Sequence, residues 1–335
     1  MKVSVIVSNF NGARFLPRLL SSLRAQTHRD LELVVVDRFS TDGSGAFLAA
    51  QPDVRVLSEP APTGLVAGYH RGAQAAGGDA FFFVNEDMWF EPDCVERLVA
   101  ALDLEARIGA SDGWHWRYDG PEWLHGAVGF VPARWAINSP HPHWSADFLV
   151  PSDGVTGIPF ACAGAALVHR RLYEELGGWD TSFFLDHEDV DFFLRAWQRG
   201  WRVVNVPGAR LHHAVNASNG QVLGGAGVTV SQRRYLAQRC NMAVIALKTF
   251  SWPALALALL QWPVVVANNL VNGRWRLLAG DLRFPAELLR RIPEAWAFRQ
   301  ANAPYNHRSP GERFFSEPRF RAKARLPAGP SEGLN

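Results

Sequence analysis

The stretch AFFFVNED, residues 80–87, decides the fold of this chain and indicates where its site lies. The apolar run at its start is bounded by turn-forming residues, which predicts a buried strand of a parallel sheet. Ligands of open α/β sheets bind at the carboxyl ends of such strands. Glu86 and Asp87 stand at this end, and core packing does not explain acidic side chains there. We therefore expect a divalent cation that holds a phosphorylated ligand.

Strand and helix patterns alternate through the first hundred residues, which predicts a parallel sheet with right-handed crossovers. Strands are expected at 3–7, 31–36, 54–57 and 81–84, and helices at 13–24, 43–50, 64–76 and 92–102. Residues 111–160 lose the pattern and are rich in Pro, Gly, Trp and His, which favours a functional loop region. The pattern then returns with a strand at 160–168, helices at 170–176 and 190–198, and a strand at 201–206.

The composition indicates a large globular body with a basic end. The chain has 335 residues, 48% of them hydrophobic, and a net charge of +2, so it can bury a large core. Residues 270–335 carry 12 Lys and Arg against 6 Asp and Glu. Three widely spaced cysteines suggest neither a disulfide framework nor a zinc site, and favour a reducing compartment. The first residues resemble a strand and not a signal peptide, so we expect a cytoplasmic protein.

Residues 249–273 contain no charged side chain and are followed by several arginines. The length alone permits a membrane span, but Pro253 and Pro263 interrupt the stretch. Three interpretations remain: helices in the membrane interface, core helices or a dimer contact, and a true span. We favour interfacial helices whose arginines reach toward anionic headgroups. Basic segments can also serve nucleic acid, which we expect not to be a partner here.

The first strand ends in a polar turn, VSNFNG at residues 7–12. It has neither a GxGxxG nor a P-loop pattern, which argues against a dinucleotide dehydrogenase or a P-loop kinase. Its polar residues Ser8, Asn9 and Asn11 either contact a base or ribose or form an ordinary tight turn. Asp37 ends the second strand beside this turn, where its carboxylate is placed to accept hydrogen bonds from a nucleobase or ribose.

Asp87 is the expected direct ligand of the cation, with Glu86 or water assisting and Asn85 shaping the turn. Hard cations prefer oxygen ligands, and Mg²⁺ or Mn²⁺ usually leaves several positions to substrate phosphates. The alternative is a solvated turn without a ligand. His213 closes a later strand as the second of two histidines, and it is either a further metal ligand or structural.

Four acidic residues occur within LDHEDVD, residues 185–191, at the start of a predicted helix. The helix macrodipole stabilises acids at this end, so capping explains one or two of them, while mutual repulsion opposes four. The apolar positions of the helix fix its buried face, which leaves Glu188 and Asp189 at the mouth of the sheet. We expect this pair to serve general-base chemistry.

Taken together, these motifs resemble family 2 glycosyltransferases, in particular the rhamnosyltransferase-like group. The resemblance covers roughly residues 1–250 and rests on the order and spacing of VSVIV with NFNG, VVVD with STDGS, NED, GGWD at 177–180, and FFLDHEDVD at 183–191. It implies the A-type glycosyltransferase fold, an α/β architecture with a Rossmann-like, mostly parallel sheet flanked by helices. The trailing amphipathic helices also resemble the membrane-associated ends of these enzymes.

The resemblance implies roles for individual residues. Asp37 matches the carboxylate that binds the pyrimidine nucleoside, and Asp87 the metal-binding aspartate of the DxD-like motif. Asp189 matches the base of the Glu-Asp motif, while Trp179 and Asp180 lie where the acceptor sits.

A metal ligand is also implied near the end of the matched region. His213 precedes Ser218 by five residues, as in the His-x-x-Gly-x-Ser pattern, with Asn216 in place of the glycine. Arg38 follows Asp37 where a small polar or acidic residue is usual, so the resemblance leaves the donor sugar open.

The implied function is an inverting, metal-dependent transfer of a sugar from a nucleoside-diphosphate sugar to a hydroxyl of a glycan or lipid-linked acceptor, as in cell-surface polysaccharide synthesis. Residues 1–230 would form the catalytic domain, with a nucleotide-sugar half at about 1–110 and an acceptor half at about 111–230. Residues 231–300 would form helices, and 301–335 an extended or disordered basic tail.

We expect the protein to lie peripherally at the inner face of the cell membrane, with a homodimer as a further possibility. A non-catalytic nucleotide-sugar-binding or scaffold protein on the same fold is the alternative. A nucleotidyltransferase is disfavoured because it would need a Gly-rich triphosphate loop near the first strand, and residues 8–12 are not one.

Overall fold

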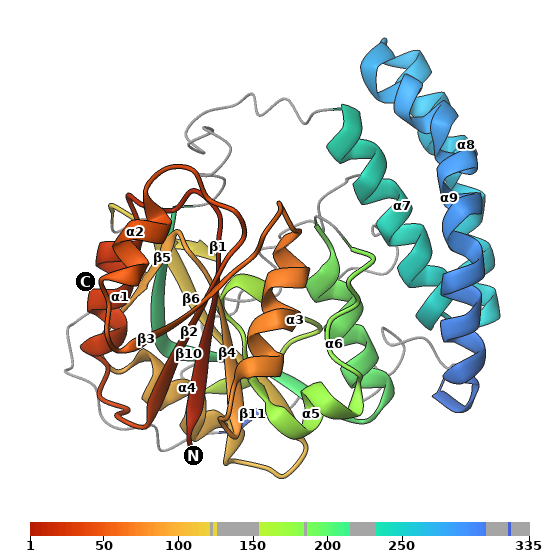
Figure 1. The fold of residues 1–335 in the computed structure, drawn as a ribbon. Coiled ribbons are helices and arrows are strands. Elements are labelled where there is room, and N and C mark those ends of the chain that lie inside the picture. Colours follow the sequence, from red (N-terminus) through yellow and green to blue (C-terminus); the bar gives the residue numbers. More distant parts are fainter. Residues whose placement is uncertain (121–122, 126–153, 184–185, 215–231, 306–320, 323–335) are drawn as a thin grey trace.

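The computed structural model describes residues 1–120, 123–125, 154–183, 186–214, 232–305 and 321–322. Within them a central β-sheet carries helices on both faces, and three long helices stand together beside this α/β body (Figure 1). Most of the Trp- and His-rich stretch and most of the basic tail lie outside the described residues, as do the positions of Asn216 and Ser218.

In the described part of the chain the sheet has eleven strands. They are β1 Val3–Asn9, β2 Leu31–Asp37, β3 Val54–Ser58, β4 Ala80–Asn85, β5 Met88–Phe90, β6 Ile108–Arg117, β7 Trp123–His125, β8 Val155–Gly157, β9 Leu167–His169, β10 Arg202–His213 and β11 Arg321–Ala322. Nine follow the order β11-β8-β10-β6-β9-β4-β1-β2-β3, while β5 pairs with β10 and β7 with β6. The longer ladders are parallel and β9 is antiparallel to both neighbours. The predicted mostly parallel sheet is confirmed.

Helices cover both faces of the sheet and create two cores. The helices of the body are α1 Leu16–Arg24, α2 Ser44–Ala49, α3 Leu65–Ala75, α4 Cys94–Leu102, α5 Arg170–Glu175 and α6 Glu188–Gln198. One core joins β1 through Val5 and Val7 to α1 and α4, and the other joins Ile6 to α3 and α6. This alternation follows from the two-residue period of a strand. The carboxyl ends of β1, β2 and β4 therefore meet at one edge of a tightly packed body.

Two sequence predictions were wrong in this body. Residues 111–117, expected to lie in an irregular region, belong to the long strand β6. Within it Gly113 lets the backbone of β10 approach closely, since a Cβ there would lie 2.3 Å from the Ala209 carbonyl oxygen. Residues 160–168 form a 3₁₀ turn, η2 Ala163–Ala165, and only the short strand β9. Small residues such as Ala and Gly have weak strand propensity, so neighbouring strands decide their structure.

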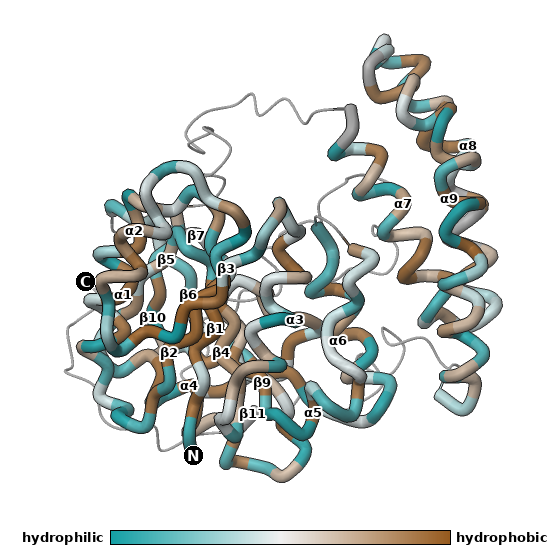
Figure 2. The backbone as a smooth tube through the Cα atoms, in the orientation of Figure 1, coloured by the Kyte–Doolittle hydropathy of each residue, from teal (hydrophilic) through white to brown (hydrophobic). Residues whose placement is uncertain are grey.

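The last three helices are α7 Gln232–Thr249, α8 Trp252–Val271 and α9 Trp275–Ala301. They contact the body through α7 and α9, while many large apolar side chains of α8 and α9 are exposed. We call these the outer apolar face: Trp252, Leu260, Val264, Leu270, Val271, Trp275, Leu282, Leu289 and Trp296. Brown apolar segments run along the helices in Figure 2. Among the described residues, no helix has both the length and the apolar character needed to cross a membrane.

A buried polar cluster ties these three helices to one another. Asp281 of α9 accepts hydrogen bonds from Tyr235 of α7 at 2.9 Å and from Asn269 of α8 at 2.7 Å. Asn269 also donates to the Tyr235 hydroxyl at 3.1 Å. Burying a carboxylate is costly unless it is paired and hydrogen-bonded, so this cluster fixes the helices in one relative arrangement.

Candidate active site

The parallel pairing of β1 and β2 sets Asn9 beside Asp37, both at the carboxyl ends of their strands. Asn9 donates from Nδ2 to Asp37 Oδ1 at 3.0 Å and to Ser40 Oγ at 3.1 Å. Asn11, whose φ is +53°, accepts from the Thr41 backbone and donates its own amide to Ser40. Asp37 is buried, and its second oxygen, Oδ2, is left to accept a hydrogen bond. The predicted nucleoside-binding residues Asn9, Asn11 and Asp37 therefore lie together.

The first turn also packs onto the end of β4. A Cβ added to Gly12 would lie 2.4 Å from Asn9 Oδ1 and 2.7 Å from Glu86 Cγ, so only glycine allows this approach. Asn9 Oδ1 is buried and has no hydrogen-bond partner among the described residues. Ser8, by contrast, donates its hydroxyl to the Leu65 carbonyl of α3 at 3.1 Å, which turns its side chain toward the helix.

Asn85 and Glu86 follow at the end of β4. The Tyr69 hydroxyl donates to Asn85 Oδ1 at 2.6 Å, and this contact orients the amide; the turn-shaping role of Asn85 stays a prediction. Glu86 is buried, and burial together with the charge of Asp87 raises the pKa of its carboxyl to about 7. The charge of Arg38 opposes this rise. Arg38, which stands where the family usually has a small polar or acidic residue, is thus a cation that interacts with acidic residues at the ends of both β2 and β4.

Strand β5 brings Asp87 to His213. In the antiparallel pairing of β5 with β10, Met88 lies opposite His213, and His213 Nε2 is 3.2 Å from Asp87 Oδ1. The neighbouring His212 instead stacks on Trp89 with ring centroids 3.6 Å apart. The histidine beside the candidate metal ligand is therefore His213.

The Asp87–His213 pair fits a divalent cation that shares its ligands with phosphate. A carboxylate oxygen and an imidazole nitrogen suit Mn²⁺, and the carboxylate suits Mg²⁺. His213 Nδ1 is buried and has no hydrogen-bond partner in the described part of the chain. Across these residues no group of three or more His, Cys, Asp or Glu could hold a metal.

Glu188 and Asp189 open α6 at the same edge. The Val190 backbone donates to Asp189 Oδ1 at 2.8 Å, and the Ala163 backbone of η2 lies 3.5 Å from Asp189 Oδ2. Burial raises the pKa of Asp189 to about 6. Burial and then the charge of Asp189 raise the pKa of Glu188 to about 8. Burial thus favours the protonated form of both carboxyls, and Glu188 Oε2 has no hydrogen-bond partner among the described groups.

The turn η2 links the two carboxylate pairs. A Cβ added to Gly164 would lie 2.5 Å from Asn85 Nδ2, while the preceding Ala163 faces Asp189. Tyr69 lies between the two carboxylate pairs. Burial raises the pKa of its phenol well above the usual value, and electrostatic interactions with Cys162, Glu86 and Glu188 add to the rise. The carboxylates from residues 86–87 and 188–189 therefore share one region of the molecule.

Trp179 and Asp180, the predicted acceptor residues, lie farther toward α7. Trp179 is buried among aromatic rings, with centroids 4.3 Å from Phe192 and 5.1 Å from Phe83. Asp180 pairs with Lys248 of α7 at 2.7 Å. Burial raises the pKa of Asp180, but the charge and hydrogen bond of Lys248 outweigh it and lower the pKa to about 2.

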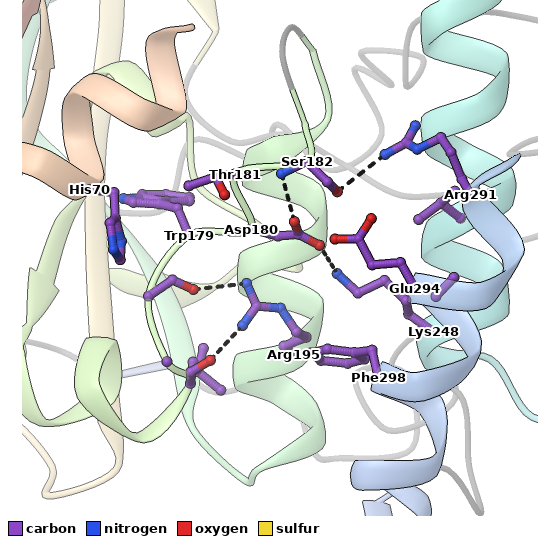
Figure 3. Close-up of a pocket in the computed structure, with 15 residues that line it drawn as sticks. His70, Trp179, Asp180, Thr181, Ser182, Arg195, Lys248, Arg291, Glu294 and Phe298 are labelled. Carbon is purple, nitrogen blue, oxygen red and sulfur yellow. Dashed lines mark hydrogen bonds and ion pairs between the residues drawn. The ribbon is translucent and has the colours of Figure 1, made fainter. Parts of the chain in front are cut away.

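A cavity of about 360 Å³ lies beside these two residues. Figure 3 shows it between the loop 177–182 and the helices α7 and α9, with the Asp180–Lys248 pair on its wall. Arg291 of α9 reaches across to Ser182 from the other side. The acceptor role of Trp179 and Asp180 stays a prediction.

Sequence reasoning missed Asp112 and His115 on β6. His115 Nε2 lies 2.9 Å from Asp112 Oδ1, and the Cys162 backbone donates to Asp112 Oδ2 at 2.9 Å. The His115 ring is 6.3 Å from that of His213, and burial followed by the charge of His213 lowers the pKa of His115 well below its usual value. The only signal in the sequence was the Asp-x-x-His spacing, in a segment not recognised as a strand.

Comparison with known proteins identifies this arrangement. The structure of GalNAc-T7 with UDP, GalNAc and Mn²⁺ superposes with a TM-score of 0.61 at 16% identity, covering 94% of this chain and 56% of that one. The structure of residues 1–349 of TarS from S. aureus gives a TM-score of 0.54 at 16% identity, with 91% of each chain covered. At such identities the likeness concerns the fold, and the A-type glycosyltransferase fold predicted from the sequence is confirmed.

The sequence comparisons give the family. The model of "Glycosyl transferase family 2" matches residues 4–177, just over half of the chain, and that of "Glycosyl transferase family group 2" matches residues 154–284. The chain therefore belongs to glycosyl transferase family 2, as predicted, and is a glycosyltransferase.

Two curated relatives agree with this assignment. The N-acetylglucosaminyl-diphospho-decaprenol L-rhamnosyltransferase of Mycobacterium tuberculosis is 27% identical over 237 residues, which cover 64% of this chain and 76% of that protein. An uncharacterized glycosyltransferase of Nostoc sp. is 35% identical over 113 residues, or 32% of this chain and 35% of the relative. The match thus spans only about a third of the Nostoc protein.

Proposed function

We propose that the protein transfers a sugar from a nucleoside-diphosphate sugar to a hydroxyl of a glycan or lipid-linked acceptor, with inversion at the anomeric carbon. The observation that carries this proposal is the shared region of the two carboxylate pairs, joined by η2 through Asn85 and Asp189. Such transfer needs a leaving diphosphate on one side of the sugar and a base on the other. Polysaccharide synthesis at the cell surface fits the mycobacterial relative, whose name states a lipid-linked diphospho-sugar acceptor.

The donor side is formed by the ends of β1, β2 and β4. Asp37 accepts hydrogen bonds from the nucleoside through Oδ2, since its Oδ1 already receives Asn9 and Ser40. Asn9 Oδ1, buried and unpaired within the described chain, is a second acceptor on this side. The neighbours with UDP and with UDP, GalNAc and Mn²⁺ support a nucleotide sugar as donor.

Asp87 and His213 are the residues that would hold Mg²⁺ or Mn²⁺. A bound cation would stabilise the charge of the departing diphosphate as a Lewis acid. The short distance between Asp87 and His213 and the polar edge around them support this assignment. The Mn²⁺ of the GalNAc-T7 structure supports it as well.

Asp189 acts as the base in this proposal. Its carboxylate takes the proton of the acceptor hydroxyl as that oxygen bonds to the anomeric carbon, and the bond to the diphosphate breaks with its electron pair leaving on oxygen. The pKa of Asp189, raised to about 6 by burial, suits a base that works near neutral pH. Trp179 and Asp180 line the cavity between the loop 177–182 and the helices α7 and α9, and they are proposed acceptor contacts.

The outer apolar face of α8 and α9 is proposed to contact the membrane from the cytoplasmic side. Many large apolar side chains exposed on two packed helices suit an interaction surface, and Arg274, Arg283 and Arg290 of the same helical region are exposed as well. Arginines next to an apolar helix face suit anionic headgroups. A dimer contact through the same face is the competing assignment.

The donor must be identified before the proposed reaction is tested. A screen of UDP-, GDP- and dTDP-sugars by thermal shift with Mn²⁺ would identify it, and replacement of Asp189 then tests the reaction. Asp189→Asn is expected to lower turnover by about 10²- to 10⁴-fold while donor affinity changes less than twofold. Wild-type turnover should fall as the pH drops through about 6, because Asp189 is then protonated. Near-normal turnover of Asp189→Asn would remove Asp189 from this role.

Two matched carboxylates complete the test. Asp87→Ala should abolish the Mn²⁺-dependent part of donor binding measured by calorimetry, because it removes the proposed metal ligand. Asp53→Asn, at an exposed surface pair with Arg24, should leave both turnover and binding unchanged. Donor binding to Asp87→Ala equal to wild type would refute the metal assignment.

A further inference from the structure

The loop before Glu188 and Asp189 is held by α7, a helix that comes much later in the chain. Arg234 donates from Nε and Nη2 to the two oxygens of the Asp186 carboxylate, each at 2.8 Å. Gln238 donates to the same carboxylate at 2.9 Å, and Asn241 donates to the Asp186 backbone carbonyl at 2.7 Å. Residues 234, 238 and 241 follow the spacing of one helix face. Three side chains on this face of α7 therefore contact the same residue, Asp186.

The backbone at this point adopts a disfavoured conformation. Asp186 has φ +63° and His187 has φ +67°, a left-handed pair that costs free energy in residues other than glycine. The His187 carbonyl then accepts the Asp191 amide at 3.0 Å and starts α6. The position of Glu188 and Asp189 therefore depends on keeping these two residues left-handed.

We propose that α7 is a positioning element of the active site, in which Arg234, Gln238 and Asn241 hold Asp186 and thereby fix the carboxyl pair at the start of α6. The proposal rests on the proposed function for its catalytic consequence, although the hydrogen bonds to Asp186 stand independently of it. Strained backbone persists where surrounding structure over-determines it, and four hydrogen bonds from three side chains supply that constraint.

A second helix supports the same contact. Arg291 of α9 donates to Asn241 Oδ1 at 2.5 Å, which leaves the amide nitrogen of Asn241 directed at Asp186. At the other end of α7, Lys248 bonds to Asp191 at 2.5 Å, one turn into α6. The loop at Asp186 and the first turn of α6 are thus contacted from both ends of α7. The C-terminal helices α7 and α9 therefore contribute contacts to the candidate active site as well as the exposed apolar face.

Charge adds to the geometric effect. Burial raises the pKa of Asp186, but the hydrogen bonds and charge of Arg234 outweigh it, so this carboxyl stays ionised. The charge of Arg234 also opposes the raised pKa of Glu188, whereas that of Asp186 adds to it. Loss of Arg234 would therefore remove a charge that opposes the raised pKa of Glu188.

The test compares three variants of the full-length protein. Arg234→Met removes the paired hydrogen bonds, and Arg234→Lys keeps the charge with a poorer match to the carboxylate. Arg239→Met is the control, because Arg239 lies on the same helix but faces Asp281 of α9 at 3.7 Å. Hydrogen–deuterium exchange of the segment 186–196 needs no substrate and reports the hold on the loop directly.

We expect Arg234→Met to speed exchange in this segment by about tenfold or more, Arg234→Lys to do so less, and Arg239→Met to leave it unchanged. With the donor from the screen, Arg234→Met should lower kcat by about 10- to 100-fold and keep the donor KM within twofold. Wild-type exchange in Arg234→Met, or equal acceleration in Arg239→Met, would overturn the proposal. Failure of the proposed function would appear differently, as absence of sugar transfer by the wild type itself.

Discussion

The first half of the chain and the C-terminal helices differ in which large side chains they bury. In the first half the large apolar side chains of the strands are buried, whereas in the C-terminal helices many apolar side chains are exposed and several charged ones are buried. Between β1 and β4 the big apolar residues face α1, α3 and α4, and most polar groups of the strands stand at the carboxyl ends. In α7–α9 the charged residues Lys248, Asp281 and Arg299 are buried, while the outer apolar face is exposed. Figures 1 and 2 show the sheet of the first half at the centre and the apolar segments of α8 and α9 at the edge of the molecule.

This difference shows how the sequence determines the structure of each region. The free energy of apolar burial is roughly proportional to area and has no direction. The fold of the first half therefore depends on the pattern and the total volume of its apolar side chains. Buried charges are tolerated only with matched partners, so α7 can dock in one geometry alone. A region fixed by directional bonds is suited to hold a strained loop such as the one at Asp186.

The largest expected effect comes from removing a buried cation of α7. Lys248 is 1% exposed and lies 2.7 Å from Asp180 and 2.5 Å from Asp191. Lys248→Met should lower the free energy of unfolding by about 3 kcal/mol, because the half-buried Asp180 loses this partner and the buried Asp191 keeps only Arg195 among its described ion partners, at 2.8 Å. Chemical denaturation at pH 7 measures it. Lys2→Met, at an exposed pair with Glu32, should cost less than about 1 kcal/mol.

The pH dependence of this difference sharpens the comparison. The folded pKa of Asp180 is lowered to about 2, with Lys248 outweighing burial, whereas the unfolded value is about 3.9. The stabilisation from this pair is therefore complete above about pH 4 and is lost as the pH falls toward 2. The gap between wild type and Lys248→Met should begin to narrow below about pH 4. Equal stability of the two proteins at pH 7 would break the comparison.

A smaller effect is expected from close packing in the first half. A Cβ at Gly72 of α3 would lie 2.3 Å from Ile6 Cγ2, whereas one at Gly45 of α2 would lie 3.6 Å from its nearest neighbour. Both Ala substitutions gain up to about 1 kcal/mol from helix propensity, but Gly72→Ala also overpacks the core. We expect Gly72→Ala to be less stable than Gly45→Ala by about 1–3 kcal/mol in thermal or urea unfolding. Similar stabilities would mean that α3 shifts freely on the sheet.

The smallest effect concerns the outer apolar face. Leu289 of α9 is 65% exposed, and insertion of about half of this side chain into a membrane interface is worth about 1 kcal/mol. Leu289→Ser should weaken binding to vesicles with anionic lipids about fivefold in sedimentation, while Leu104→Ser, at an exposed leucine of the body, should not. Equal vesicle binding of wild type and Leu289→Ser would contradict the membrane assignment and favour another partner for the outer apolar face.

Sequence reasoning worked where a side-chain pattern decides the structure. The strands ending at Asn9, Asp37 and Asn85 were predicted because their apolar runs are long and bounded by polar turns. Parallel pairing then brings their carboxyl ends to one edge, which explains why Asn9 and Asp37 were expected to lie together. His213 and Asp87 meet for a further reason, the pairing of β5 with β10, and the family resemblance had implied that contact without revealing the strand.

The same reasoning failed where tertiary contacts decide. Strand β6 has the sequence IGASDGWHWR, which lacks a clear apolar alternation. It pairs with β7, β9 and β10, and since no local pattern marked it as a strand, Asp112 and His115 went unnoticed. The hold of Arg234 on Asp186 joins residues 48 positions apart, and no local pattern predicts such a pair. The burial of a charged residue of α7, Lys248, was equally unpredictable from the sequence. Hydropathy shows which residues are apolar, but it does not show which side of a helix packs against the body.

The cluster around Asp281 also has a consequence for how the helical end can change. An insertion of one residue in α9 ahead of Asp281 would rotate its carboxylate by about 100°, away from Tyr235 and Asn269, and leave a fully enclosed charge without its donors. The register of the three helices is locked by a single side chain. A one-residue insertion in α9 ahead of Asp281 should therefore disrupt the packing of the three helices, whereas an insertion in the connection between α8 and α9 leaves these hydrogen bonds in place.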